Sequence, residues 1–244
     1  MTDIKNFEIE NGTLKRYHGK ESHVIIPDCV TTVDSFAFQD CTDLISVTIP
    51  DSVRKIMLCV FNDCTNLRSV KIGKNVEVVA LSGAFGACSS LSSIEVSEEN
   101  QHFYSKNNCL IRRDMQTLLV GCQSSAIPED VLRIGTNAFS YCESLHSIVI
   151  PEGVKKIGWC AFSHCTSLSH VVIPSSVDSL GAYAFVGCNN LRSIEVSAEN
   201  ECYYSQGNYV VKRASNTVVV ACKDAVIPEG LHIESSAFTD EKDT

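Results

Sequence analysis

The sequence predicts a solenoid of stacked coils, with mostly β or mixed α/β structure, rather than a globular domain with one core. A phrase of the form V-x-x-h-x-x-x-A/V-F-x-x-C-x-x-L-x-x-h-x-h, where h is aliphatic, returns every 23 residues. A longer repeat lies above it, because residues 30–130 and 131–230 each hold three copies and an insert. Full copies start at Val30, Val53, Val76, Val131, Val154 and Val177, and half a copy starts at Leu231.

The end of each phrase predicts a short strand. In the first copy, Leu44, Val47 and Ile49 show apolar alternation, and Pro50 then stops the strand. Stacked coils place such strands side by side as a parallel sheet. The segment 34–38 is expected on the opposite side as a tight turn or a short 3-10 piece. A buried spine is predicted for the recurring Phe: Phe38, Phe61, Phe85, Phe139, Phe162, Phe185 and Phe238.

The first 29 residues predict a hairpin that caps the first coil. Two apolar runs flank Asn11-Gly12, which is a strong signal for a two-residue hairpin turn. Without such a cap, the first coil of a solenoid would expose its core.

Two inserts, residues 97–130 and 197–230, each follow a block of three repeats, residues 30–96 and 131–196. The sequence predicts that repeats and inserts together form one continuous solenoid. In each insert two apolar runs flank a polar segment, which predicts a β-hairpin. These runs are residues 109–112 and 117–120 in the first insert, and 209–212 and 217–220 in the second.

Residues 231–244 contain the half repeat and an acidic tail. Leu231, Ile233 and Phe238 end the array without a polar capping coil. The sequence therefore predicts either an adapted last coil or end-to-end association of two chains through that coil.

The cysteines follow the repeat, which favours packing over a disulfide framework. Six of the 13 stand three residues after the recurring Phe: Cys41, Cys64, Cys88, Cys142, Cys165 and Cys188. A free Cys behaves as a small buried hydrophobe. The odd number, together with a polar start that lacks an apolar signal core, favours reduced thiols and a cytoplasmic location. A leader removed from the chain would instead indicate secretion or a cell surface.

Composition excludes two classes of partner. The net charge of −9 disfavours nonspecific binding to nucleic acid, which needs clustered Lys and Arg. No stretch has the roughly 18 apolar residues of a membrane span, so no membrane insertion is expected.

Enzymatic and metal sites are weakly indicated. His164-Cys165 could form a Cys–His nucleophile, but both residues fall at repeated positions, whereas a catalytic group is placed once. Cys59-x4-Cys64 and Cys160-x4-Cys165 resemble zinc spacing only loosely. We therefore expect no enzyme, no metal and no cofactor.

Two sets of residues are candidates for binding. The outward strand positions form a strip on the predicted sheet: Ser46, Thr48, Ser69, Lys71, Ser93, Glu95, Ser147, Val149, His170, Val172, Ser193 and Glu195. The alternative interpretation is that this strip is only a solvated face of the sheet. The second candidate set is the aromatic residues of the inserts: Phe103, Tyr104, Tyr203, Tyr204 and Tyr209. The alternative interpretation is that they pack the inserts onto the solenoid.

Four stretches carry a resemblance to a known family. VTTVDSFAFQDCTDLISVTIPDS, FEIENGTLKRYHGKESHVIIPDCV and the insert openings from Asn100 to Tyr104 and from Asn200 to Tyr204 resemble the BspA-like class of leucine-rich repeats. The resemblance implies a leucine-rich repeat solenoid, curved and right-handed, with a parallel concave sheet. It also implies binding of proteins or surface glycans, often at a bacterial cell surface in adhesion, and no enzymatic activity.

The leading hypothesis is therefore a non-enzymatic scaffold that binds a protein through the concave sheet or the inserts. The alternative is an adhesin module that binds carbohydrate or a host surface, and a third hypothesis is a cysteine-dependent enzyme.

Overall fold

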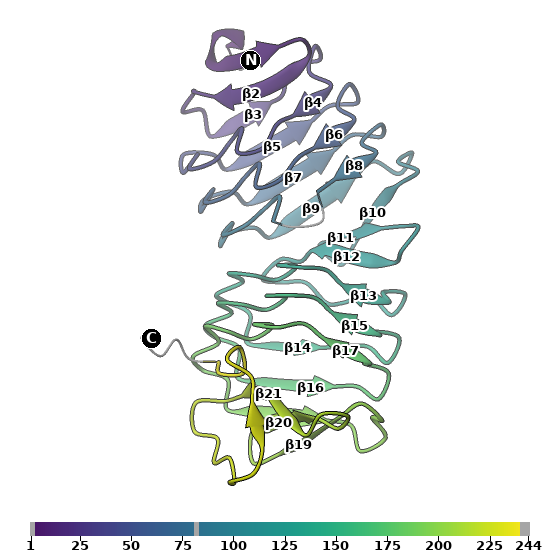
Figure 1. The fold of residues 1–244 in the computed structure, drawn as a ribbon. Helices are drawn as coiled ribbons and strands as arrows, with labels where there is room; N and C mark the ends of the chain where they lie inside the picture. Colours follow the sequence, from purple (N-terminus) through teal and green to yellow (C-terminus); the bar gives the residue numbers. More distant parts are fainter. Residues whose placement is uncertain (1–2, 81–82, 240–244) are drawn as a thin grey trace. The chain divides into compact units, whose positions relative to one another are not determined.

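The computed structural model describes residues 3–80 and 83–239 and forms two units. Unit 1 comprises Met1–Met115 and Leu119–Ser125, and unit 2 comprises Gln116–Leu118 and Ala126–Thr244. Both consist of stacked coils with parallel strands, as the repeat predicts (Figure 1). The division falls within the first insert.

The first ladder of unit 1 is the sheet predicted from the end of each phrase. Its strands are β3 (His23–Ile25), β5 (Ser46–Ile49), β7 (Ser69–Ile72) and β9 (Ser93–Val96), in that order. All pairs are parallel and in register, so that Val47 lies opposite Val70, and Val70 opposite Ile94. These three side chains are buried, which confirms the predicted alternation between core and surface.

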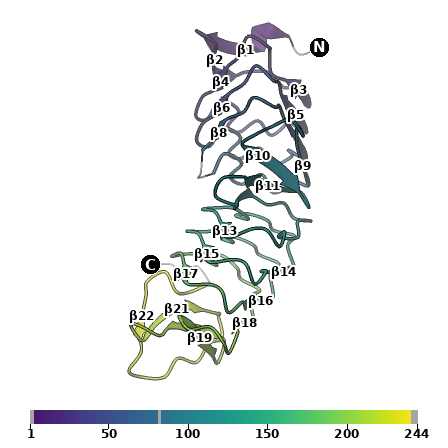
Figure 2. The ribbon, with the colours of Figure 1, turned by 90° about the vertical axis from the view of Figure 1, so that its right-hand side faces the viewer.

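A second ladder, which the sequence pattern does not predict, lies on the other side of unit 1 (Figure 2). Its strands are β4 (Thr32–Val33), β6 (Lys55–Ile56) and β8 (Val78–Val79), and each is two residues long. Val33, Ile56 and Val79 are buried at the fourth position of the phrase. Two residues are too few to show period-two alternation, so this ladder has no sequence signal of its own.

The N-terminal hairpin extends this second ladder. Strands β1 (Phe7–Glu10) and β2 (Thr13–Tyr17) are antiparallel, and β2 pairs in parallel with β4. Asn11 and Gly12 have φ of 49° and 74°, the backbone that a two-residue hairpin turn requires. The ring of Tyr17 stacks on Phe38 at 5.0 Å between centroids, so the hairpin covers the first coil as predicted.

Tight turns, not helices, connect the ladders. In the segment 34–38, Phe36 has φ of 64°, and the Phe38 amide donates to the carbonyl oxygen of Val60 in the next coil at 2.8 Å. Among the described residues the only helical turn is η1 (Ile4–Asn6), which lies outside the repeats. The alternative of 3-10 pieces in the repeats is therefore wrong.

Unit 2 repeats the two-ladder arrangement. One ladder contains β12 (Thr117–Val120), through which the unit boundary runs, then β13 (Arg133–Ile134), β15 (Lys156–Ile157) and β17 (Ser179–Leu180). The other contains β14 (Ser147–Val149), β16 (His170–Ile173) and β18 (Ser193–Val196). Both ladders are parallel.

The Phe spine is present in both units. In unit 1 the rings of Phe38, Phe61 and Phe85 stack with centroids 5.1 and 5.0 Å apart. In unit 2 the corresponding distances from Phe139 to Phe162 and from Phe162 to Phe185 are 5.1 and 5.4 Å. These rings are buried, and replacing one with Ala is expected to cost about 3–5 kcal/mol.

Each insert begins with a strand that the sequence did not reveal. In unit 1, β10 (Phe103–Lys106) pairs with β11 (Cys109–Arg112). In unit 2, β19 (Tyr203–Gln206), β20 (Tyr209–Lys212) and β21 (Thr217–Ala221) form an antiparallel meander. The predicted hairpin corresponds to β20 and β21, and β19 adds a strand before it.

The last described coil is adapted rather than regular. Strand β22 (His232–Ile233) pairs in parallel with β21, and Ala221 forms a bridge with Phe238. Leu231 and Phe238 are only partly buried against the cluster that contains Tyr209. End-to-end association through this coil stays a prediction, and most of the predicted acidic tail, residues 240–244, lies outside the described residues.

Candidate functional site

The predicted strip lies on the outward face of the long-stranded ladder in each unit. In unit 1 its residues form two rows across neighbouring strands. One row is Ser46, Ser69 and Ser93, and the other is Thr48, Lys71 and Glu95. Parallel, in-register pairing produces these rows, because it sets equivalent positions of successive coils opposite one another.

A hollow of about 600 Å³ lies over one end of this strip in unit 1. Thr48, Lys71 and Glu95 line it from strands β5, β7 and β9. Asp28, Asp51 and Glu98 also line it, and sequence reasoning missed these three. A signal for two of them existed: each Asp directly follows an Ile-Pro pair that ends a strand.

The hollow is acidic. Its lining contains the four carboxylates of Asp28, Asp51, Glu95 and Glu98 and a single ammonium group, that of Lys71. Lys71 pairs with Glu95 on the neighbouring strand at 3.0 Å. Both side chains are largely exposed, so solvent screens this pair and leaves it a weak constraint.

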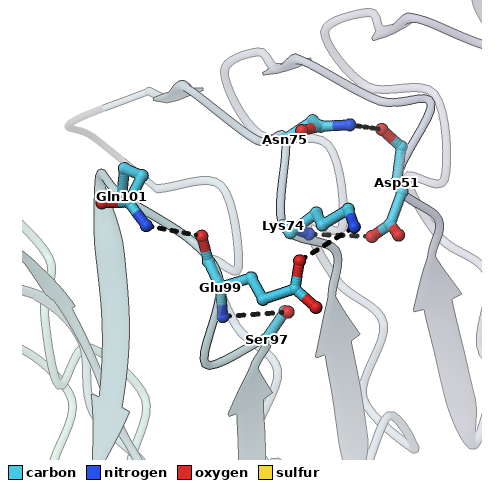
Figure 3. A network of polar contacts seen from close by, with 6 residues as sticks. All are labelled: Asp51, Lys74, Asn75, Ser97, Glu99 and Gln101. Carbon is cyan, nitrogen blue, oxygen red and sulfur yellow. Dashed lines mark hydrogen bonds and ion pairs between the residues drawn. The ribbon is translucent and has the colours of Figure 1, made fainter.

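A polar network holds the loops at the rim of the hollow (Figure 3). The Asp51 Oδ1 accepts from the backbone amide of Lys74 at 2.9 Å, and the Lys74 Nζ donates to Glu99 at 2.9 Å. Asn75 donates to the carbonyl oxygen of Asp51 at 2.7 Å. The bond to Glu99 raises the pKa of Lys74. The network joins three successive coils along the rim of the hollow.

The strip of unit 2 has a different character. Val149 and Val172 occupy the positions that Thr48 and Lys71 hold in unit 1, and their side chains are 81% and 42% exposed. Glu195 completes that row on β18, while Ser147, His170 and Ser193 form the other. The same backbone thus presents a charged row in unit 1 and a mainly apolar row in unit 2.

The insert aromatics are placed differently from what a binding role requires. Phe103, Tyr203 and Tyr209 are buried, and the Tyr203 hydroxyl accepts from the backbone amide of Leu180 at 3.0 Å. A buried ring cannot contact an external ligand. The expectation that these three bind a partner is therefore wrong, and they pack the inserts onto the coils instead.

Tyr104 and Tyr204 are half-buried beside an arginine. The guanidinium groups of Arg113 and Arg213 lie 4.9 and 5.1 Å from the centroids of these rings. Each arginine also donates to backbone carbonyl oxygens of its own insert. The two tyrosines therefore take part in the structure of the inserts.

The Cys–His candidate lacks the geometry of a nucleophile. The Cys165 thiol is buried and donates to the carbonyl oxygen of Phe139 at 3.1 Å. A hydrogen-bonding contact with Cys188, together with burial, raises the pKa of Cys165 well above its usual range. The His164 ring stacks on Tyr141 with centroids 4.5 Å apart. A thiolate at Cys165 is therefore strongly disfavoured.

Two kinds of feature are absent from the described part of the chain. No group of three or more His, Cys, Asp or Glu side chains is arranged to hold a metal ion among residues 3–80 and 83–239. Over the same residues, no helix has the length and apolar character needed to cross a bilayer.

Comparison with known proteins identifies similar repeats. The family model described as the BspA type leucine rich repeat region (6 copies) matches residues 8–119 and 111–242. Among curated proteins, no significant match was found.

Solved structures with the same fold come from bacteria. A leucine-rich repeat protein from Eubacterium ventriosum is 20% identical, with a TM-score of 0.52, and the match covers 77% of this chain and 66% of that one. This chain therefore spans just under two thirds of that protein. The pneumococcal vaccine antigen PcpA is 14% identical with a TM-score of 0.53, covering 91% and 79% of the two chains. At these identities the likeness shows the fold alone.

Proposed function

Because the chain belongs to the BspA type leucine-rich repeat family, we propose that it is a non-enzymatic scaffold that binds another protein through the outward face of its long-stranded ladder. The single observation that carries the proposal is the acidic hollow over β5, β7 and β9. Its floor is a regular sheet and Asp51 is hydrogen-bonded to the next coil at its rim, which supports a site that needs little rearrangement on binding.

The charge of the hollow indicates the chemistry of the partner. Two of its carboxylates, Asp28 and Glu98, are exposed and protrude from loops, while Lys71 is already paired with Glu95. A segment that carries Lys or Arg would complement this surface and would associate faster at low ionic strength. We therefore propose that the partner presents a basic segment to unit 1.

The test is a peptide array of extended segments with graded charge, probed with the full chain and with the double variant Glu95→Lys/Glu98→Lys. The matched control is the double variant Glu10→Lys/Glu77→Lys, which makes the same total charge change beside the other ladder of unit 1. We expect the wild-type and the control to select Lys- and Arg-rich peptides, and Glu95→Lys/Glu98→Lys to bind them at least about tenfold more weakly. Selection without charge bias, or equal loss in the control, would overturn the proposal.

We also propose that the protein works where thiols stay reduced. None of the thirteen cysteines, all of which lie in the described residues, is in a disulfide, and nine of them are buried. Thiol titration of freshly isolated, unfolded protein should return close to thirteen thiols per chain. A titre several thiols lower, restored by a reductant, would contradict this proposal.

A further inference from the structure

The first two coils of unit 1 place two cysteines next to each other. Cys41 and Cys64 hold the same position in successive coils, and each follows an aspartate in a left-handed turn, Asp40 and Asp63, with φ of 61° and 60°. The Asp40 amide donates to the carbonyl oxygen of Asn62 at 3.0 Å and so joins the two turns. Equivalent residues of paired parallel segments lie about 4.8 Å apart. A disulfide requires a Cα separation of about 4.4–6.8 Å, so this spacing suits one.

The carbonyl oxygen of Phe38 contacts both cysteines. It accepts from the Cys41 amide at 3.2 Å and from the Cys64 thiol at 3.0 Å. The two cysteine side chains are also in hydrogen-bonding contact with each other. The two sulfur atoms therefore need little movement of the backbone to form a bond.

Of these two thiols, Cys41 is the one that a small molecule can reach. Cys64 is fully buried, whereas Cys41 is partly exposed and lines a hollow of about 240 Å³. The hollow lies between residues 16–21, at the end of β2 and in the loop after it, and the turn at residues 39–44. An external reagent would therefore react with Cys41 first.

Arg16 places a positive charge near the Cys41 thiol. Its guanidinium donates to the carbonyl oxygens of Phe36 and Gln39 at 2.8 and 3.2 Å. The Cys41 Sγ lies 3.9 Å from the same Gln39 oxygen. The two hydrogen bonds thus hold the guanidinium on the turn that carries the thiol.

These neighbours favour the ionised thiol at Cys41. The Cys64 side chain lowers the pKa of Cys41 most, and the charge of Arg16 lowers it further. Burial and the carboxylates of Asp40 and Asp43 act in the opposite direction, but the pKa stays below its usual value. A thiolate is the nucleophile in exchange with a disulfide, so Cys41 is suited to attack one.

The duplicated block supplies an internal comparison. Cys142 and Cys165 of unit 2 hold the positions of Cys41 and Cys64, and both are buried. The same pair of thiols is therefore closed to solvent in unit 2. Access to Cys41 is a property of the first coil and not of the repeat.

Charged groups of both signs line the hollow. Arg16 and Lys20 are cations, and Glu21, Asp40 and Asp43 are carboxylates. A disulfide whose halves carry both ammonium and carboxylate groups would meet opposite charges on this lining, whereas an uncharged disulfide would not. Cystine and oxidised glutathione have this chemistry.

We infer that Cys41 and Cys64 are a thiol pair that a zwitterionic low-molecular-weight disulfide oxidises to an intrachain disulfide. The Cys41 thiolate attacks one sulfur of the small disulfide, forms a mixed disulfide and releases one small thiol. The Cys64 sulfur then attacks the Cys41 sulfur, and the second small thiol leaves as the mixed disulfide breaks. Two electrons pass from the protein to the small disulfide, and the two cysteine protons end on the released thiols.

The first step makes the second one easier. The Cys41 side chain is the largest cause of the raised pKa of Cys64, ahead of burial. Once Cys41 is a mixed disulfide it carries no thiolate, so that cause is removed. Cys64 can then give up its proton to the departing thiol more readily.

This inference goes beyond the protein-binding proposal and does not depend on it. The proposal that the thiols stay reduced concerns the resting protein, and the thiol pair would be oxidised only when small disulfides accumulate. The thiol titration of isolated protein tests the resting state. The experiment below starts from fully reduced protein, so the two can fail separately.

The rate of the new link is measured in the full wild-type chain. Reduced protein is incubated with oxidised glutathione, quenched with acid and N-ethylmaleimide, and mapped by mass spectrometry without reduction. Digestion at aspartate and glutamate separates the two cysteines of each pair, because Asp51 and Glu152 lie between them. We expect the link from Cys41 to Cys64 to form at least about tenfold faster than any link within the buried pair of unit 2.

Variants assign the two steps. Cys64→Ser should leave glutathione attached to Cys41, because the second thiol is missing. Cys41→Ser should give no link to Cys64. Cys142→Ser, at the position of Cys41 in unit 2, is the matched control and should form the link at the wild-type rate. Circular dichroism melting checks that each variant is folded, and the comparison of the two pairs in the wild-type chain needs no variant.

A second reagent tests the charged lining. The exposed Cys29 should form only a mixed disulfide, so the ratio of Cys41 to Cys29 modification cancels the intrinsic reactivity of each reagent. We expect this ratio to be at least about threefold higher with oxidised glutathione than with the uncharged hydroxyethyl disulfide.

Three results would overturn the inference. One is modification of Cys41 no faster than that of the buried cysteines. Another is a mixed disulfide at Cys41 of the wild-type chain that persists without a link to Cys64. The third is the same ratio of Cys41 to Cys29 modification with both reagents, which would remove the zwitterionic disulfide as the matching ligand.

Discussion

The thiol of Cys64 donates a hydrogen bond to the carbonyl oxygen of Phe38, one coil earlier, with Sγ and O 3.0 Å apart. The same bond recurs from Cys88 to Phe61 at 3.1 Å and from Cys188 to Phe162 at 3.0 Å. The repeated Cys is thus a small side chain that fits the interior and satisfies a buried carbonyl oxygen of the neighbouring coil. Ala would fill less space and leave that oxygen without its donor.

Replacing this thiol should therefore destabilise the array. We expect Cys64→Ala to lower the free energy of unfolding by about 1–2 kcal/mol, through the lost hydrogen bond and the small cavity. Urea unfolding measures the change. Cys29→Ala, at an exposed cysteine, is the control and should change stability by less than about 0.5 kcal/mol. Equal changes in the two variants would show that the hydrogen bond from Cys64 to Phe38 does not contribute to stability.

The buried Asn at the start of each insert should contribute more to the free energy of unfolding than the repeated Cys does. The Asn200 Nδ2 donates to the carbonyl oxygens of Pro174 and Val177 at 2.8 and 3.0 Å. Its Oδ1 accepts from the amides of Cys202 and Tyr203 at 2.9 and 2.7 Å. Asn200→Ala removes all four bonds inside the protein, so we expect a loss of about 3–5 kcal/mol in unfolding free energy.

The control for this variant is Asn190→Ala. Asn190 also donates to a carbonyl oxygen one coil earlier, that of Thr166 at 2.8 Å, but from an exposed position. Water replaces that bond, so the expected change is below about 1 kcal/mol. If chemical denaturation gave the two variants the same midpoint, burial of the Asn200 network would not be the source of its stability.

The left-handed turns provide a stabilising substitution. Phe36 is exposed and has φ of 64°, so its side chain strains the backbone without filling the core. We expect Phe36→Gly to raise the free energy of unfolding by about 0.5–1 kcal/mol. Ser35→Gly, at the preceding residue outside the left-handed region, should lower it by a similar amount. A loss in both variants would contradict the assignment of strain to Phe36.

The cysteines should differ in reactivity with pH. Burial raises the pKa of Cys109 and of Cys222 to about 11, whereas the adjacent Cys64 side chain lowers the pKa of the half-buried Cys41. We expect iodoacetamide, followed by peptide mass spectrometry, to modify Cys41 well before Cys109 or Cys222 at about pH 8. Labelling of all three at one rate in the folded protein would refute this order.

The raised pKa values of Cys109 and Cys222 also predict that the protein becomes less stable at alkaline pH. In the folded protein the pKa of Cys109 and of Cys222 lies above the ordinary thiol value of 9.0, so folding favours the protonated thiols. Their contribution to stability is therefore complete below about pH 9 and is lost as the pH rises toward 11. Thermal melts across this range should show a falling midpoint, and a constant midpoint would mean that the buried thiols do not titrate with unfolding.

Sequence reasoning reached the long-stranded ladder, the Phe spine and the N-terminal hairpin because each has a local signature. Val47 and Ile49 alternate with polar residues, Phe38 recurs with the coil, and Asn11-Gly12 marks a specific turn. The strip residues followed from the same alternation, since the side opposite the core is outward by geometry.

Other features had no such signature. The aromatic residues of the inserts looked alike in sequence, yet Tyr209 is buried and Tyr204 lies under an arginine. Asp28 and Asp51 are one coil of 23 residues apart along the sequence, and only stacking of the coils brings them to one hollow. Trp159 and Tyr183 likewise become a pair only when neighbouring coils are in register.

The amino-acid sequence by itself determined the repeat, the coil and the residues that fill its interior, because burial of a periodic apolar set is decided within one 23-residue phrase. The tertiary structure decided which surface residues meet. Register between coils, the two-residue strands of the second ladder and the left-handed turns place side chains from separate copies next to one another. Those relationships depend on pairs of coils, and no single phrase contains them.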